Sequence, residues 1–263
     1  MQHNNSKDTI RQSTQEYMLG LSAPTPGKYL SKPLLVCRNQ SEKLLDGKSV
    51  AVVGNSGKLL YHNYGEAIDA HDAVIRFNWA PTEGYEAQVG SKTTIRLSNT
   101  HYLKAVTDDK FDEKMGKNYT GWDKDFYFTK IKNQTIVLKK MSSWVNDPET
   151  DWRINKRIEE VGNNTIDCLE ERFMTYCDAI LHPKLSSMGL LGVAMGIANR
   201  DEGHGAKSID CYGFNFYEEE EEDRHYYDVM TQSKEQQAEH HNFDQEKGVF
   251  LTLVNEGVIK IHD

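Results

Sequence analysis

The stretch Val50-Ala51-Val52-Val53-Gly54-Asn55-Ser56-Gly57 decides the fold. Four small or β-branched apolar residues lead directly into a polar turn that contains glycine, a pattern typical of a buried strand that ends abruptly. A second apolar run, Ala73 to Phe77, follows a helical crossover and ends on Asn78. Such a pair forms a βαβ unit, and open α/β sheets bind ligands at the carboxyl ends of their strands.

Beyond this unit, apolar runs alternate with helical patterns. Strands are expected over 94–99, 126–128, 135–138, 208–214 and 258–261, and helices over 151–160, 173–181, 190–199 and 243–254. The charged residues 101–125 predict irregular structure. The alternation favours an α/β fold with a largely parallel central sheet flanked by helices.

Residues 1–47 contain several prolines and are expected to form an N-terminal arm, whereas 48–263 form a single domain. The first 20 residues contain no apolar signal region, and no stretch is long enough to span a bilayer. We therefore expect a soluble protein or one whose anchor is absent from this chain. Sequons at 4, 39, 118, 133 and 163 hint at a secretory path.

The net charge of −9 argues against a general nucleic-acid-binding protein, which needs a basic face. It does not exclude a local site for an anionic small molecule. The four cysteines, Cys37, Cys168, Cys177 and Cys211, match no zinc-binding spacing. Disulfides and buried free thiols both remain open for them.

Two motifs have the form of an anion or nucleotide site. The turn Gly54-Asn55-Ser56-Gly57 matches neither the dinucleotide fingerprint nor the phosphate-binding Walker loop, and on its own it is equally consistent with a structural turn. Ser186 and Ser187 precede an apolar helix, so N-capping is the simplest interpretation. The free N–H groups of such a helix start also attract anions.

Histidines and acidic residues supply the candidate chemistry. His225 and His241 are the titratable candidates, and His241 lies just before a helix that Asn242 is expected to cap. Glu246 then falls in the first turns of that helix, where it can orient a neighbouring histidine. Asp123-Lys124-Asp125 has the form that binds a divalent metal in many nucleotide-sugar transferases, but a solvated loop is the simpler interpretation.

Together these pieces resemble the eukaryotic sialyltransferase family, which uses CMP-activated sugars. Four motifs occur in the family's order and carry the resemblance. They are Val50 to Lys92, with Ala51-Val52-Val53-Gly54-Asn55-Ser56-Gly57 and Asp72-Ala73-Val74-Ile75-Arg76-Phe77-Asn78; Ser186-Ser187-Met188-Gly189 through Tyr212-Gly213-Phe214; His225-Tyr226-Tyr227-Asp228; and His241 with Glu246. The resemblance covers about 48–261, with residues 101–165 unmatched.

The resemblance implies a GT-A-like, Rossmann-type fold and a donor that is CMP-sialic acid or CMP-Kdo, used without a metal or cofactor. It also implies roles for particular residues. Asn55, Asn78, Ser187, Gly189 and the backbone at Asn215 would bind the nucleotide; His225 would bind the phosphate; His241 would be the general base; and Glu246, Ser56 and Tyr226 would support them. The acceptor would be a glycan hydroxyl, the reaction would invert the anomeric centre, and the location would be the Golgi lumen.

Some residues depart from the family pattern. Val50 stands where the family usually has a cysteine, and its usual partner near 199–207 is also absent, so that disulfide cannot form. Met188 stands where threonine or serine is usual. The stretches 96–99 and 257–262 are closer to plant and algal relatives, some of which are thought to transfer Kdo. Two rival hypotheses remain: a metal-dependent transferase using Asp123 and Asp125, and a non-catalytic glycan- or nucleotide-binding relative.

Overall fold

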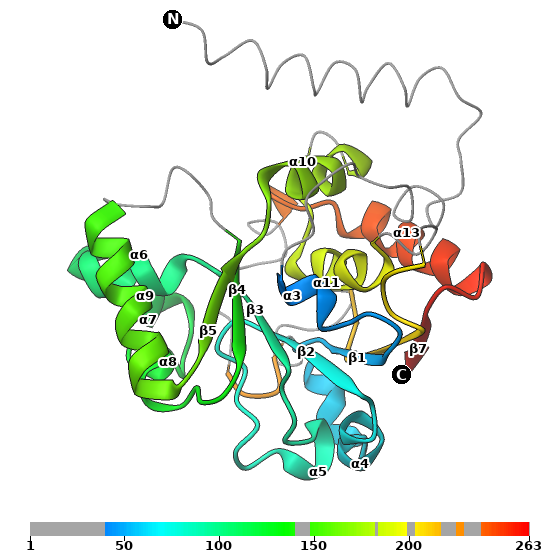
Figure 1. Ribbon diagram of the computed structural model, residues 1–263, viewed down its shortest axis with the longest axis horizontal. Helices are drawn as coiled ribbons and strands as arrows, with labels where there is room; N and C mark the ends of the chain where they lie inside the picture. The colour runs from blue at the N-terminus through cyan, green and yellow to red at the C-terminus, as the bar shows by residue number, and fades with distance from the viewer. Residues whose placement is uncertain are drawn as a thin grey trace, which may run out of the picture.

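The computed structural model describes residues 40–139, 148–181, 184–198, 203–216, 225–228 and 238–262. Seven strands form one sheet in the order β5-β4-β3-β2-β1-β6-β7, and all of its pairings are parallel (Figure 1). The predicted α/β fold with a largely parallel sheet is therefore confirmed. The strands are β1 Ser49–Val53, β2 Ala73–Phe77, β3 Ile95–Asn99, β4 Thr135–Lys139, β5 Thr165–Cys168, β6 Ser208–Tyr212 and β7 Lys260–His262.

Helices join most of the strands. They are α3 Gln40–Lys43, the 3-10 helix η1 Gly57–Tyr61, α4 Gly65–Asp69, α5 Glu86–Val89, α6 His101–Thr107, α7 Asp109–Asn118, α8 Phe126–Thr129, α9 Pro148–Gly162, α10 Glu171–Ile180, α11 Met188–Ile197 and α13 Phe243–Asn255. Among these described helices, none combines the length and the apolar character that a bilayer crossing needs.

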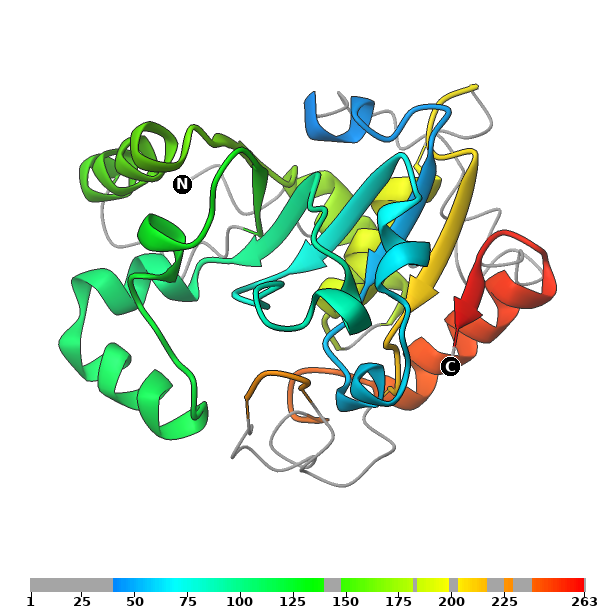
Figure 2. The same cartoon turned by 90° about the horizontal axis from the view of Figure 1, so that it is seen from below.

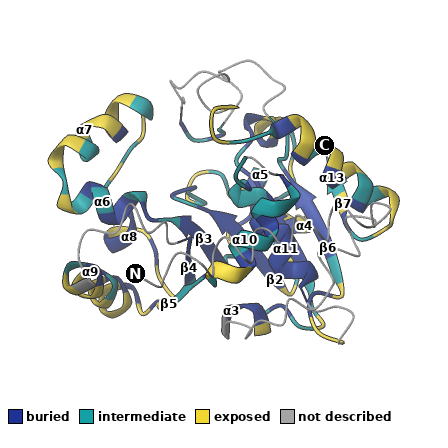
Figure 3. Ribbon diagram, turned by 90° about the horizontal axis from the view of Figure 1, so that it is seen from above, coloured by how far each residue is buried: buried dark blue, intermediate teal, exposed yellow. Residues whose placement is uncertain are grey.

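Helices cover both faces of the sheet because side chains along each strand alternate between two apolar layers. On one face, Val50, Val52 and Ile75 join a core that includes residues of α10, α11 and α13. On the other, Ala51 and Val53 pack with residues of η1, α4 and α5. Figure 2 shows the strands and the surrounding helices, and Figure 3 shows that the central strands are buried. A separate cluster beside β4 holds residues of α6, α7, α8 and α9.

The strand order reverses at β1. From β1 the chain proceeds outward through β2, β3, β4 and β5, and it returns to β6 on the opposite side of β1. A sheet of this kind opens a crevice beyond the carboxyl ends of the two strands at the reversal. Gly54 and Gly213 lie there, and a Cβ atom on Gly54 would be 2.3 Å from the carbonyl oxygen of Gly213. The backbones after β1 and β6 can approach this closely only because Gly54 has no side chain.

Two arginines lie side by side within the sheet. Arg76 of β2 pairs in register with Arg96 of β3, and both side chains are buried. Arg76 donates to the carbonyl oxygens of Val89 and Lys92. Burial lowers the pKa of Arg76 to about 10, so the guanidinium stays charged at neutral pH. The arginines thus fasten the loops that follow β2 by hydrogen bonds to backbone carbonyls.

Two sequence expectations about the region after β3 are wrong. Residues 101–118 form the helices α6 and α7. The carboxylate of Asp108 caps α7 by accepting from the N–H groups of Lys110 and Phe111. Most of the surface of α7 is exposed to solvent, and its charged residues lie on that surface (Figure 3). Residues 126–128 form the helix α8 instead of a strand, since a short apolar run has no periodicity that separates the two.

Strand β5 was missed because it is an edge strand with no fully buried residue and hence no apolar signal. In the expected arm, Ser41 donates to Asp167 and Leu45 is fully buried in the core, while residues 1–39 lie outside the described ranges. The boundary at 47 stays a prediction. The described cysteines, Cys168, Cys177 and Cys211, are free thiols, whereas Cys37 lies outside the described residues.

Candidate active site

A cavity of about 480 Å³ opens at the carboxyl edge of the sheet, beside the reversal at β1. It brings together residues from all four sequence motifs. The predicted site residues that line it are Asn55, Ser56, Asn78, Ser187, Gly189, Asn215, His225, His241 and Glu246. Tyr226 is the predicted residue that does not line it.

The wall formed by β1 and β2 presents two asparagines. Asn78 adopts a left-handed conformation with φ of 50°, which asparagine tolerates better than most residues. Its backbone carbonyl accepts from Arg96 at 2.8 Å, and its side-chain oxygen accepts from the N–H of Asn99 at 3.2 Å. These contacts fix the side chain of Asn78 at the edge of the cavity.

Asn55 is held differently. Its side-chain nitrogen donates to the hydroxyl of Tyr227 at 3.3 Å, and its carbonyl accepts from the N–H of Tyr226. Its side-chain oxygen is buried and has no hydrogen-bond partner among the described residues. An unpaired buried acceptor costs free energy, so this oxygen marks a place where a ligand can supply a donor.

Tyr226 supports the wall from behind. Its hydroxyl donates to the carbonyl of Pro81, and its ring is buried. Because its own N–H binds Asn55, Tyr226 ties the third motif to the first without facing the cavity.

The start of α11 forms the opposite wall. Ser187 caps the helix by accepting from the N–H of Leu190 at 3.2 Å. Its hydroxyl and its own N–H both donate to the carboxylate of Glu246 in α13. Burial raises the pKa of Glu246 to about 7, although the hydrogen bonds from Ser187 oppose that rise. Gly189 lies so close to the ring of Phe214 that a Cβ atom would meet it at 2.7 Å.

His225 is positioned by a carboxylate. Its Nδ1 lies 2.6 Å from the carboxylate of Asp228, whose second oxygen accepts from the indole N–H of Trp79 at 3.4 Å. The imidazole stacks with the rings of Tyr119 and Tyr227. With Asp228 at Nδ1, Nε2 is the nitrogen left to contact a ligand.

His241 is positioned by a backbone carbonyl. Its Nδ1 lies 2.9 Å from the oxygen of Leu185, so Nδ1 carries the proton and Nε2 keeps its lone pair. Burial lowers the pKa of His241 below its ordinary 6.5, and nearby Lys139 adds to that effect. The imidazole is therefore neutral at pH 7 and can accept a proton.

The expectation that Glu246 orients a histidine is wrong. Asn242 does cap α13 by accepting from the N–H of Gln245, as expected. This cap places Glu246 in the first turn, where its carboxylate faces Ser187 across the gap between α13 and α11. Glu246 therefore joins the second and fourth motifs to each other.

Residues of the unmatched centre also line the cavity. One face of α7 supplies Phe111, Lys114, Met115 and Asn118, and Lys139 comes from the end of β4. Their spacing of i, i+3, i+4 and i+7 places them on one helix face, but only Phe111 and Met115 are apolar, so the apolar periodicity that predicts a helix is weak here. Lys139 carries the same sequence signal as Asn78: each is the polar residue directly after an apolar run, 135–138 for Lys139 and 73–77 for Asn78. That signal could have identified Lys139 as a site residue.

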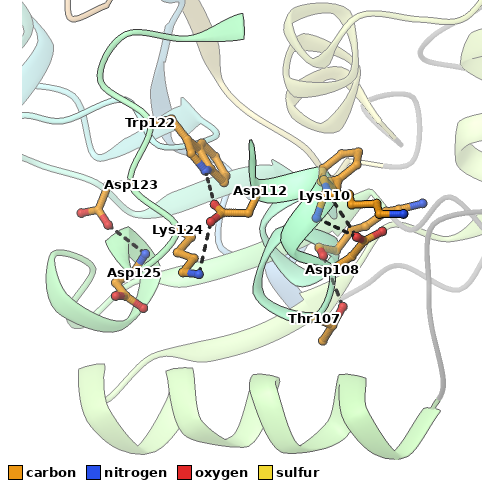
Figure 4. A network of polar contacts seen from close by, with 10 residues as sticks. Thr107, Asp108, Lys110, Asp112, Trp122, Asp123, Lys124 and Asp125 are labelled. Atoms are coloured by element: carbon orange, nitrogen blue, oxygen red, sulfur yellow. Dashed lines mark hydrogen bonds and ion pairs between the residues drawn. The ribbon is translucent and has the colours of Figure 1, made fainter. Parts of the chain in front are cut away.

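The segment after α7 is held to it by Asp112, which accepts from the indole N–H of Trp122 at 2.8 Å and pairs with Lys124 at 3.2 Å (Figure 4). Asp123 accepts from the N–H of Asp125 at 2.8 Å, a local turn contact. Neither Asp123 nor Asp125 lines the cavity. The described residues contain no group of three or more histidine, cysteine or acidic side chains placed to hold a metal.

The charge of the cavity opposes that of the chain. Among the described residues that line it, Lys114 and Lys139 are the lysines and Glu246 is the single acidic residue. The chain as a whole carries −9. Such a local excess of cationic groups suits an anionic ligand.

These features define an α/β protein with a polar, cationic ligand site at the reversal point of a parallel sheet. The sequence model described as "Glycosyltransferase family 29 (sialyltransferase)" matches residues 4–258, and the chain belongs to this family.

Known proteins share parts of the chain. It is 32% identical over 223 residues to CMP-N-acetylneuraminate-beta-galactosamide-alpha-2,3-sialyltransferase 1 of Sus scrofa, a match that covers 81% of this chain and 53% of the relative. It is 46% identical over 78 residues to beta-galactoside alpha-2,6-sialyltransferase 2 of Homo sapiens, covering 29% of this chain and 15% of the relative. The chain thus spans about half or less of the length of these relatives.

A crystal structure of a mammalian sialyltransferase in complex with Gal-beta-1-3GalNAc-ortho-nitrophenol has the same fold. It superposes with a TM-score of 0.55 at 21% identity, covering 98% of this chain and 86% of that structure. The likeness confirms the predicted GT-A-like fold.

Proposed function

We propose that this protein is a glycosyltransferase that moves sialic acid, or a related 2-keto sugar acid such as Kdo, from its CMP conjugate to a glycan hydroxyl. One observation carries the proposal: His225 and His241, each oriented through Nδ1, line the same cavity as Asn55 and Asn78. Family membership supports the same activity.

The nucleotide would occupy the part of the cavity beside β1, β2 and β6. The unpaired oxygen of Asn55 would accept a hydrogen bond from CMP, and the side-chain N–H₂ of Asn78 would donate one. Gly189 and Asn215 also line the cavity. The missing side chain of Gly189 leaves room for the ring of Phe214 on the cavity wall.

His225 would stabilise the leaving group. As the bond between the anomeric carbon and the phosphate oxygen breaks, CMP departs with the electron pair and negative charge develops on that oxygen. A hydrogen bond from Nε2 of His225 to that oxygen would be strongest at that moment, while Asp228 holds the ring through Nδ1.

His241 would act on the acceptor. Its neutral Nε2 would take the proton of the attacking hydroxyl while the acceptor oxygen bonds to the anomeric carbon. Attack from the side opposite CMP in a single displacement inverts that centre. No metal or cofactor is needed in this scheme, because His225 would stabilise the charge that develops on the leaving phosphate.

Incubation with CMP-sialic acid and with CMP-Kdo, in the presence of a glycan acceptor, tests the proposal through release of CMP. We expect release from at least one donor and a faster rate with acceptor than without. CMP binding with no release from either donor would favour a non-catalytic nucleotide-binding relative. Absence of CMP binding would refute the nucleotide site itself.

Asn78→Ala should weaken CMP binding by about 10-fold, because it removes a hydrogen bond to the nucleotide and the contact that holds Asn99. Calorimetric titration with CMP measures this. Asn133→Ala is the matched control, since Asn133 has a similar φ of 55° and lies away from the cavity. Equal weakening in both variants would mean that backbone strain is the cause and that Asn78 does not contact CMP.

The rate of CMP release should be unchanged by EDTA and by the double substitution Asp123→Asn/Asp125→Asn. The reason is that Asp123 binds the backbone of Asp125 and neither residue lines the cavity. Dialysis against EDTA followed by rate measurement with and without added Mg²⁺ or Mn²⁺ tests this. A rate that falls and is restored by either ion would revive the metal-dependent rival.

The proposed location is the Golgi lumen, in keeping with the family and with the sequons. Of these, Asn133 and Asn163 are on the surface of the described structure, where a glycan can be attached.

A further inference from the structure

Lys139 is a buried cation on the wall of the cavity. It ends β4, its side chain is 7% exposed, and Nζ donates to the carbonyl oxygen of Ser186 at 2.9 Å. An ammonium group has three donors, and this neutral carbonyl satisfies one. Within the described part of the chain, Lys139 forms no ion pair with a carboxylate.

The acidic groups around Lys139 are engaged elsewhere. Asp178 accepts from the N–H of Ser186 at 2.7 Å, and Glu246 accepts from Ser187. Burial lowers the pKa of Lys139, which shows that the site penalises its charge. A buried ammonium without a bound carboxylate is costly, so its place beside a cavity points to an anion supplied by a ligand.

The start of α11 adds a second set of donors at the same place. Ser186, whose carbonyl binds Lys139, directly precedes the cap residue Ser187. The N–H groups of Met188 and Gly189 are in the first turn, where no intrahelical acceptor exists, and both residues line the cavity. Lys139 and the positive end of a ten-residue helix therefore converge on one side of the cavity.

The position of Lys139 distinguishes between the two anionic groups of a CMP-activated sugar acid. Strand β4 is three strands from β1, or about 14 Å at the usual strand spacing, whereas the segment of His225 is tied to Asn55 after β1. Lys139 instead neighbours His241, since the two bind the consecutive carbonyls of Ser186 and Leu185. The phosphate belongs beside His225, and the group beside the base belongs to the sugar.

We propose that Lys139 binds the carboxylate of the transferred 2-keto sugar acid and so selects donors that carry one. The proposal rests on the function proposed above. The carboxylate is attached to the anomeric carbon, so a group that holds it beside His241 also holds the reacting carbon near the base.

Two substrates and one substitution test this. The wild-type protein should use CMP-sialic acid about 10- to 100-fold better, by kcat/KM, than the analogue whose C-1 carboxylate is a neutral amide, the range expected for a charge-assisted hydrogen bond. Lys139→Met keeps the length of the side chain and removes its charge. It should lose most of this discrimination, with a raised KM for CMP-sialic acid.

Competitive inhibition by CMP separates the carboxylate from the phosphate, because CMP has only the phosphate. The inhibition constant of CMP should change less than about 3-fold in Lys139→Met, which is well below the effect of losing one charge-assisted hydrogen bond. The exposed Lys110→Met is the control for loss of a cation elsewhere and should leave both constants unchanged. A parallel loss of CMP inhibition would assign Lys139 to the phosphate or to the fold and overturn the proposal.

The wild-type comparison alone keeps the proposal falsifiable if Lys139→Met does not fold. Equal use of the carboxylate and amide donors by the wild-type protein would refute a carboxylate site anywhere in the cavity. Failure to release CMP from either donor would instead refute the proposed function, so the two failures are distinguishable.

Discussion

His241→Ala should lower turnover at least about 100-fold while CMP affinity stays nearly unchanged. The magnitude follows from losing a general base that removes the acceptor proton in the transition state. The affinity should persist because Nε2 of His241 faces the acceptor hydroxyl in the proposed reaction, whereas CMP contacts the asparagines after β1 and β2. The substitution thus separates the chemical step from nucleotide binding.

Turnover of the donor identified by CMP release, together with calorimetric titration of CMP, measures both effects. His204→Ala is a control, since His204 is exposed, pairs with Asp46 and does not line the cavity. A His241→Ala variant that keeps the wild-type rate would remove His241 from the mechanism. Loss of CMP affinity equal to the loss of rate would mean that His241 binds the nucleotide.

The pH profile gives an independent check of the same residue. His241 must be neutral to accept a proton, and burial lowers its pKa below 6.5. The neutral form therefore persists as the pH falls through 6.5, and the acid limb attributable to His241 should lie below that value. A limb at or above pH 6.5 that disappears in His241→Ala would contradict this assignment of its environment.

Gly54→Ala should destabilise the fold by about 2 kcal/mol or more, at the upper part of the range for overpacked positions. The added Cβ would lie 2.3 Å from the carbonyl oxygen of Gly213 and 3.3 Å from that of Tyr212. Both neighbours are backbone, so no side chain can turn aside. The ends of β1 and β6 must separate, and this displaces Asn55 and Asn215, which follow these strands and line the cavity.

Chemical unfolding and CMP titration measure the two consequences, and we expect CMP affinity to fall at least about 10-fold as the two nucleotide contacts move. Gly116→Ala is the matched control: Gly116 lies in α7 with no atom within 4 Å of an added Cβ. That substitution should stabilise the protein by about 0.5–1 kcal/mol through helix propensity. Equal stability of Gly54→Ala and the wild type would show that the two strand ends are not held as closely as described.

The motifs that could be predicted from the sequence share one property: their local pattern dictates their position. Buried strands such as β1 and β2 end in polar residues, so the edge that holds Asn55 and Asn78 follows from the strands themselves. Resemblance to a family then supplied the order of the remaining motifs. The placement of His225 and His241 in one cavity agrees with it.

The parts that could not be predicted depend on contacts between distant segments. Nothing near Glu246 in the sequence indicates that its carboxylate binds Ser187, which is 59 positions away. Helix α7 was obscured because a helix that leaves most of its surface in water needs few apolar residues. Arg96 lies in an expected strand, but nothing in the sequence indicates that it binds the carbonyls of Asn78 and Ala80.

The paired arginines have a consequence for how the sheet assembles. Slipping β2 by one residue against β3 would turn Arg76 into the layer that holds Phe77 and Leu97, where the core is apolar. A buried guanidinium there would lose the carbonyls of Val89 and Lys92 that now accept its hydrogen bonds. Parallel strands pair slowly because a loop must close before their contacts form. Arg76 and Arg96 make the misaligned pairings unstable, so the ends of β2 and β3 that carry Asn78 and Asn99 meet in one alignment during folding.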